Sequence, residues 1–198
     1  MTKTIEELKL EIISGTVLNR VRVDHSSDST IDLKVLMPKA ISDGIDLESL
    51  DEITVEIESI AQRKIKTTMI EDIVLKLTTP FDSVLITDDS LGLVVPSYFA
   101  ILRSYDFQNI NPKYLAFVLN SSYGKSRLAS MTTGVANAML KIKDIMTFPV
   151  PILPAKEQEM LGDLYISFCE KRTAMKKYLA SEEALMDNII TEAISKEV

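Results

Sequence analysis

The 198-residue chain has few of the residue types that build disulfides, metal centres and catalytic triads. Its single cysteine, Cys169, excludes an internal disulfide bond and is typical of a reducing compartment. A single histidine, His25, cannot by itself supply a metal site or a Ser-His-Asp triad. No apolar stretch reaches the roughly 20 residues of a membrane-spanning helix, and the charged N-terminus does not resemble a signal peptide. We therefore expect a cytoplasmic protein with no membrane partner.

Charge is distributed unevenly along the chain, whose formal net charge is −7. Residues 101–150 carry six basic side chains against two acidic ones, so the remainder of the chain is strongly acidic. A negative net charge alone disfavours nucleic-acid binding, because neutralisation of phosphates supplies most of the non-specific affinity. The basic block nevertheless offers a candidate contact surface for phosphates.

Short β-like segments dominate residues 14–104. Alternating or β-branched runs predict strands in IDLKVLM, in ITVEIESI, and in the ranges 73–77, 84–87, 93–95 and 98–102. Residues 1–13 are expected to form a short amphipathic helix, and further helices are expected from Pro112 and in KIKDIM. The predicted fold class is α+β, with a β-rich domain that carries short helices.

Three prolines fall within PVPILP, residues 149–154. Each lacks an amide N–H and disfavours helix in the residue before it, so residues 148–154 should be extended. From Ala155 onward there is no proline and only one glycine, and apolar residues recur every three or four positions. This pattern predicts a long amphipathic helix, or two helices broken near Ala180.

A continuous helix from Glu157 to Ser195 would be roughly 58 Å long. That length exceeds what a core of this size can cover, so the apolar stripe should meet another helix, in this chain or in a partner. The predicted stripe consists of Leu161, Leu164, Phe168, Met175, Leu179, Leu185 and Ile189.

Three motifs point only weakly to catalysis. The GKS at 124–126 ends like a phosphate-binding loop, but Leu119 stands where that loop needs a glycine. Asp32 and Lys34 could belong to a metal-dependent nuclease if a neighbouring strand supplied another carboxylate. NINPKY resembles the Asn-Pro-Pro-Tyr loop of amino-methyltransferases, but Lys113 replaces the second proline and no glycine-rich loop precedes it. The sequence therefore predicts a binding protein with no catalytic residues and no metal site.

Four features occur in an order that resembles the specificity (S) subunit of type I restriction–modification systems. They are the loop Thr133-Gly134, the segment Pro149–Pro154, the pair Glu157-Gln158 and the long helix that follows. The resemblance implies a target recognition domain at 1–148, a proline-rich joint at 149–156 and a helical spacer at 157–198. The usual S subunit carries two recognition domains and two spacers, so this chain resembles a half-subunit.

The resemblance also implies a function. S subunits read DNA and direct an adenine methyltransferase subunit and a restriction subunit, and S-adenosylmethionine and ATP bind to those partners. This chain would then bind double-stranded DNA, hold no cofactor of its own and form a homodimer through its C-terminal helix. The prolines would fix the direction in which the helix leaves the domain, as a spacer between two half-sites requires.

Candidate DNA contacts are basic side chains, which neutralise phosphates and read guanine, and the Thr-Gly loop, whose glycine permits close backbone approach. Arg20 and Arg22 alternate in a segment expected to be extended, so both should point the same way. The candidates are Arg20, Arg22, Arg63, Lys64, Lys66, Arg103, Lys113, Lys125, Arg127, Thr133, Gly134, Lys141 and Lys143.

Two alternatives stay open. One is a dimeric protein–protein interaction module with a β-rich head on a helical stalk, which the acidic composition and the scarcity of aromatic residues for base stacking favour. The other is the nuclease that uses Asp32 and Lys34.

Overall fold

A computed structural model describes residues 1–25, 27–105, 110–132 and 139–195. Its strands are β1 (Thr2–Thr4), β2 (Glu11–Ser14), β3 (Thr30–Val35), β4 (Asp51–Glu56), β5 (Ile73–Lys76), β6 (Ser83–Leu85), β7 (Phe99–Arg103) and β8 (Pro149–Pro151). Its α-helices are α1 (Ile57–Ala61), α2 (Pro112–Asn120), α3 (Ser122–Met131), α4 (Ile142–Met146) and α5 (Ala155–Ser195). The predicted α+β class is confirmed, and α5 is continuous through Ala180.

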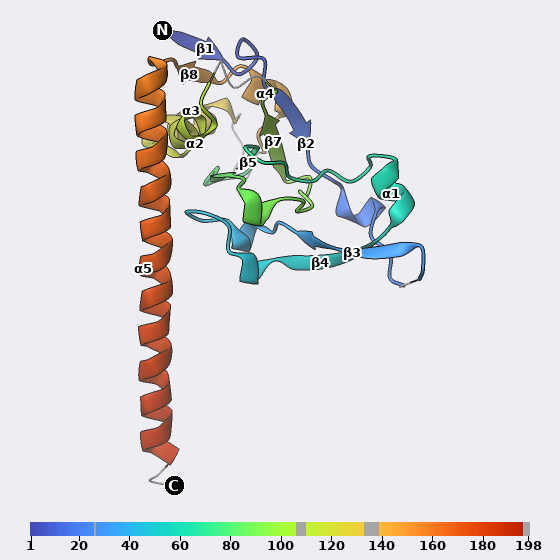
Figure 1. Ribbon diagram of the computed structural model, residues 1–198, viewed down its shortest axis with the longest axis vertical. Helices are drawn as coiled ribbons and strands as arrows, with labels where there is room; N and C mark the ends of the chain where they lie inside the picture. Colours follow the sequence, from blue (N-terminus) through green and yellow to red (C-terminus); the bar gives the residue numbers. More distant parts are fainter. Residues whose placement is uncertain (26, 106–109, 133–138, 196–198) are drawn as a thin grey trace.

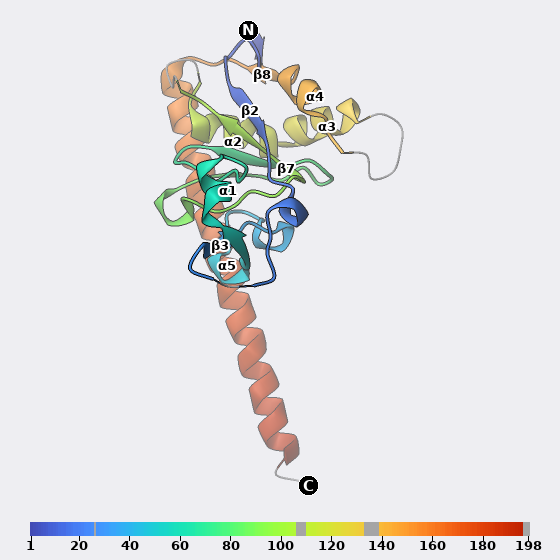
Figure 2. The same cartoon turned by 90° about the vertical axis from the view of Figure 1, so that its right-hand side faces the viewer.

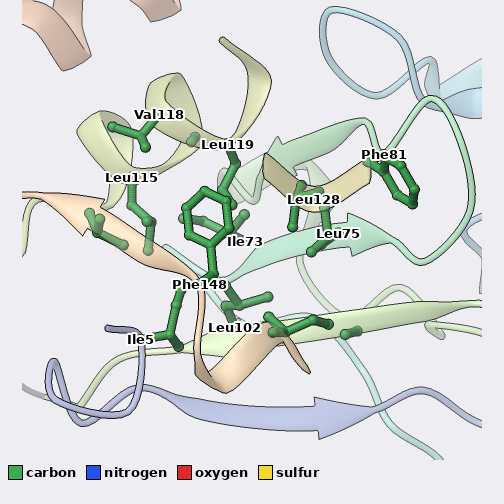
Figure 3. Close-up of a cluster of buried hydrophobic side chains, with 14 of the residues drawn as sticks. Ile5, Ile73, Leu75, Phe81, Leu102, Leu115, Val118, Leu119, Leu128 and Phe148 are labelled. Carbon is green, nitrogen blue, oxygen red and sulfur yellow. The ribbon is translucent and has the colours of Figure 1, made fainter. Parts of the chain in front are cut away.

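The head of the molecule is built on an antiparallel sheet of order β2-β7-β5-β6. Strand β5 is buried on both faces, and its alternating side chains enter two different core clusters. Ile73 and Leu75 face α2 and α3, together with Leu115, Leu119 and other side chains (Figure 3). Val74 points the other way, into a second cluster with Phe99 and Ile101. The β3–β4 hairpin covers a third, smaller cluster.

Helices α2 and α3 form because their first turns are capped locally. The Asn111 side chain accepts a hydrogen bond from the Tyr114 amide, and Pro112 occupies the first turn, where a missing N–H costs nothing. The glycine of the GKS motif has a packing role. A Cβ at Gly124 would lie 2.1 Å from the Val118 carbonyl oxygen, so only glycine lets α3 turn this closely against α2.

The proline segment is extended, as predicted, and forms β8, which pairs antiparallel with β1. The Ile5 N–H donates to the Phe148 carbonyl and the Ile152 N–H donates to the Met1 carbonyl, so the segment's hydrogen bonds to the N-terminal residues are made at even-numbered positions. Pro149 and Pro151 fall between those positions, where no N–H is needed. Their carbonyls accept hydrogen bonds from the hydroxyls of Tyr123 and Tyr114, respectively. The N-terminal strand is thereby joined to the segment that immediately precedes α5.

Three sequence-based expectations for secondary structure are wrong. Residues 1–13 do not form a helix but contain β1, a turn and β2, because pairing with β8 and β7 outweighs the helical spacing of Ile5 and Leu8, which are nevertheless buried. The strand expected over 53–60 ends at Glu56 and continues as α1. Residues 93–95 form isolated bridges through Val94.

Helix α5 runs along one side of the head and then projects beyond it in both views (Figures 1 and 2). With 41 residues it is about 60 Å long. Its first half packs on α2, and a Cβ at Gly162 would lie 2.7 Å from the Cβ of Lys113. From Ala174 to Ser195 every residue is exposed. Within the described part of the chain, the apolar side chains in the distal half of α5 therefore stay uncovered.

Candidate nucleic-acid interface and helix stripe

Arg103 forms a buried ion pair with Asp72. Its Nη2 lies 2.6 Å from Asp72 Oδ2, its Nε donates to Oδ1 at 2.8 Å, and Nη2 also donates to the Thr67 carbonyl. The side chains of Arg103 and Asp72 are only 14% and 1% exposed. Hydrogen bonding to Asp72 raises the pKa of Arg103. This candidate DNA contact therefore has a structural partner that ties β7 to the segment before β5.

Two further candidates are paired at the surface. Lys113 Nζ lies 2.7 Å from Asp163 of α5, and Lys125 Nζ lies 2.6 Å from Asp82. The hydrogen bond to Asp163 raises the pKa of Lys113. Both lysines keep a third or more of their side-chain surface exposed, and exposed pairs of this kind contribute little to stability. Either lysine could leave its carboxylate for a phosphate.

Among the described residues, the basic candidates from Arg63 onward that are not yet discussed have no carboxylate partner. Arg63, Lys64 and Lys66 follow α1, and the first two are exposed. Lys66 Nζ donates to the Arg63 carbonyl, and both side chains line a hollow of about 300 Å³ that also contains Tyr105. We call Arg63, Lys64 and Lys66 the α1-proximal basic patch.

A second set consists of Arg127, Lys141 and Lys143, which are exposed and have no carboxylate partner in the part of the chain that the structure describes. They lie on α3, at the start of α4 and within α4, on either side of residues 133–138. The predicted loop contacts Thr133 and Gly134 lie outside the described residues.

Arg20 and Arg22 do not lie in one extended segment. The argument that both side chains point the same way is therefore wrong. Arg20 ends a short 3-10 helix (Leu18–Arg20), and Arg22 lies in an isolated bridge with Val55. Val21 between them is buried under the hairpin, and this burial sets the local turn. Both arginines are exposed, and Arg22 Nε lies 4.0 Å from Asp24.

The residues proposed for a nuclease lie on the exposed face of the β3–β4 hairpin. Asp32 stands opposite Thr54 and accepts its hydroxyl hydrogen bond at 2.6 Å. In residues 1–25, 27–105, 110–132 and 139–195, no three His, Cys, Asp or Glu side chains converge as metal ligands would. The hairpin therefore gives the nuclease alternative no support.

Gln158 of the Glu-Gln pair has a clear structural role that the sequence did not disclose. Its buried side chain accepts a hydrogen bond from the Asn111 amide and donates to the Leu153 carbonyl. It thus joins the start of α5 to the start of α2 and to the end of the proline segment.

Cys169 is one of the few other buried residues of α5. Burial raises the pKa of its thiol, which suits a packing role and not a reactive one.

The predicted stripe of α5 divides into two parts. Leu161 is half-buried and packs against the main core cluster of the head. The other predicted members, Leu164, Phe168, Met175, Leu179, Leu185 and Ile189, are each between 53% and 65% exposed. Met160, Tyr178, Met186, Ile190 and Ile194 extend the same exposed surface. An apolar surface of this extent is typical of an interaction surface. Among the described helices, none is long and apolar enough to cross a membrane.

No protein-family model and no curated protein matches the chain. Solved structures do match it. An S subunit of a type I restriction–modification system from M. genitalium aligns over 95% of this chain, at 13% identity and a TM-score of 0.60. The HsdS subunit from Thermoanaerobacter tengcongensis aligns over 87%, at 17% identity and a TM-score of 0.56. A chain from a study of complex assembly and conformational transition of the type I system aligns over 87%, at 16% identity and a TM-score of 0.57.

The alignment covers only 44% to 45% of each of those chains. The resemblance in the order of the motifs and the likeness in three dimensions therefore agree: this chain has the fold of one half of a type I restriction–modification S subunit.

Proposed function

We propose that this protein is a DNA specificity subunit of half size, which pairs with a second copy of itself through α5. The observation that carries the proposal is one S-type head on one long helix whose distal apolar surface is exposed. Two copies would supply the two heads and two helices of the S subunits, which are about twice as long. We expect the dimer to direct an adenine methyltransferase subunit, and a restriction subunit where one exists, to a bipartite DNA target in the cytoplasm. S-adenosylmethionine and ATP would bind to those partners.

The acidic net charge is compatible with this role if the partner subunits supply much of the basic surface around DNA. An isolated dimer should then bind DNA weakly and with steep salt dependence. Purification of the tagged protein from its own cells, followed by mass spectrometry, tests the assembly. A stoichiometric adenine methyltransferase is the expected result, and recovery with unrelated partners would favour the interaction module.

The α1-proximal basic patch is expected to contact phosphates, because Arg63 and Lys64 are exposed and have no carboxylate partner among the described residues. Each lost phosphate contact lowers the slope of log affinity against log salt by about 0.9. We therefore expect the triple variant R63Q/K64Q/K66Q to lower that slope by about two to three in the purified complex.

Fluorescence anisotropy between low and physiological salt would measure this slope. The variant K3Q/K9Q/K39Q removes three charges at positions that are not candidate contacts and should leave the slope nearly unchanged. Equal slopes for the two variants would place the DNA contacts elsewhere on the head.

A second candidate function is the interaction module with no DNA target. The exposed stripe favours it as much as it favours a specificity subunit, because both require a helical partner. Selection of bound sequences from a random DNA pool by the complex distinguishes them. Enrichment of a bipartite sequence supports the specificity subunit, and an unenriched pool supports the interaction module.

A further inference from the structure

Asp43 lies in the loop before β4 and contacts two cations of α5. Its Oδ1 is 3.0 Å from Arg172 Nη1, and its Oδ2 is 2.5 Å from Lys176 Nζ. Arg172 and Lys176 are four residues apart, so they lie on the same face of the helix, one above the other. The Asp43 side chain is 13% exposed. We call Asp43, Arg172 and Lys176 the clamp.

The clamp is positioned where close packing between head and helix ends. Cys169 is the last buried residue of α5, and Thr173 is the last that is half-buried. Asp43 lines two hollows, one of about 440 Å³ on the side of Thr87 and Lys177 and one of about 260 Å³ on the side of Asn120. Hollows therefore flank the contact, and the ion pairs join α5 to the head between them, with the side chains of Arg172 and Lys176 51% and 53% exposed.

Another ion pair joins the head to α5 at a point where the two are already closely packed. Lys113 and Asp163 meet beside Gly162, where α2 and α5 are in direct backbone-level contact. Tight packing already fixes the helix at that point. Within the described residues, the ion pairs between head and α5 are this one and the two of the clamp. Only the clamp acts at a distance from the packed start of the helix.

Distance gives the clamp leverage over the far end of α5. From Gly162 to Ser195 the helix runs about 50 Å. A change of about 10° in its tilt would move Ser195 by about 9 Å, which is the length of two to three base pairs at about 3.4 Å each. A bipartite target is read only if two heads sit at a set separation, so a freely tilting helix would weaken discrimination of that spacing.

We propose that Asp43 is a positioning residue that sets the angle between head and α5, and thereby the spacing of the two DNA half-sites. The second part rests on the function proposed above, whereas the first concerns this chain alone.

Distances between spin labels test the first part. Labels at Glu58→Cys on α1 and Ser181→Cys on distal α5, in a Cys169→Ala background, report the tilt when labelled chains are diluted into unlabelled protein. Asp43→Ala should broaden the distance distribution about twofold, because the ion pairs that hold one orientation are lost. Asp163→Ala removes the other head–helix carboxylate and should leave the width unchanged. The helix-side variant R172Q/K176Q should reproduce the effect of Asp43→Ala.

Salt and charge exchange provide two more comparisons. At 1 M salt, where the screening length falls to about 3 Å, the unsubstituted protein should broaden and Asp43→Ala should not change further. The exchanged variant D43K/R172E/K176E should recover the narrow distribution. A width in Asp43→Ala equal to that of the unsubstituted protein would overturn the clamp.

Affinity for DNA with the half-site spacing altered by one or two base pairs tests the second part. The ratio of affinities for the original and altered spacing should fall about fivefold in Asp43→Ala, and affinity for a single half-site should not change. A broadened distribution with unchanged spacing discrimination would refute the role in spacing. A broadened distribution without any DNA binding would refute the proposed function and leave the clamp standing.

Discussion

If the protein pairs through α5 as proposed, substitution of Leu179 and Ile189 by glutamate is expected to convert it from a dimer to a monomer. Both side chains are more than half exposed on the distal part of α5, where no described segment of the chain covers them. Burial of an apolar side chain of this size contributes about 1.5–3 kcal/mol. Two such residues from each protomer, replaced by like charges, should raise the dimer dissociation constant by at least about a thousandfold, since each 1.4 kcal/mol is tenfold.

Light scattering coupled to size-exclusion chromatography, over a range of protein concentrations, would measure the change. Ala184 and Thr191 lie on the side of α5 turned away from Leu179 and Ile189 by helical geometry, and both are exposed. The variant A184E/T191E therefore adds the same charge to the same helix and should remain a dimer. If the unsubstituted protein is already a monomer at high concentration, the exposed stripe must serve a different partner, such as a second kind of specificity subunit.

Substitution of Arg103 by methionine is expected to lower the free energy of unfolding by about 3–5 kcal/mol. The change would leave Asp72, which is 1% exposed, as a buried charge without its cation, and loss of one member of a buried pair has a cost of this size. Native domains have only about 5–15 kcal/mol of stability in total. The variant should therefore unfold at a much lower denaturant concentration.

Guanidinium denaturation at a fixed protomer concentration would measure the difference, because dimer stability depends on concentration. Lys113→Met removes the cation of an exposed pair and should cost at most about 1 kcal/mol. The double variant R103M/D72N should recover part of the loss, because no buried charge remains. An Arg103→Met variant as stable as Lys113→Met would mean that Arg103 is free to serve as a DNA contact.

Local pattern was enough to predict the elements that periodicity defines. The three-to-four-residue spacing after Ala155 predicted α5, and alternating or β-branched runs predicted β3, β5 and β7. The prolines of 149–154 predicted an extended segment, because the loss of an N–H and the restriction on the preceding residue act within a few positions. The order of short motifs predicted the S-type fold, although no single motif was specific.

Contacts between residues distant in sequence decided the rest. Ile5 and Leu8 have helical spacing, but their segment pairs with β8, almost 150 residues later. Basic side chains were recognisable as candidates for DNA contact, yet only the fold places Asp72 against Arg103 and Asp163 against Lys113.

The clamp could not be predicted from the sequence for the same reason. Asp43 is one acidic residue among many in the sequence, and it acquires a role only because the fold brings it to α5. By itself, the sequence determined that the protein has a mixed head, an extended exit segment and a long helix with an apolar stripe, since those properties depend on neighbours along the chain. The tertiary structure alone decided which charges are already paired, which part of the stripe is free, and what holds the helix at its angle, because each depends on partners that only folding brings together.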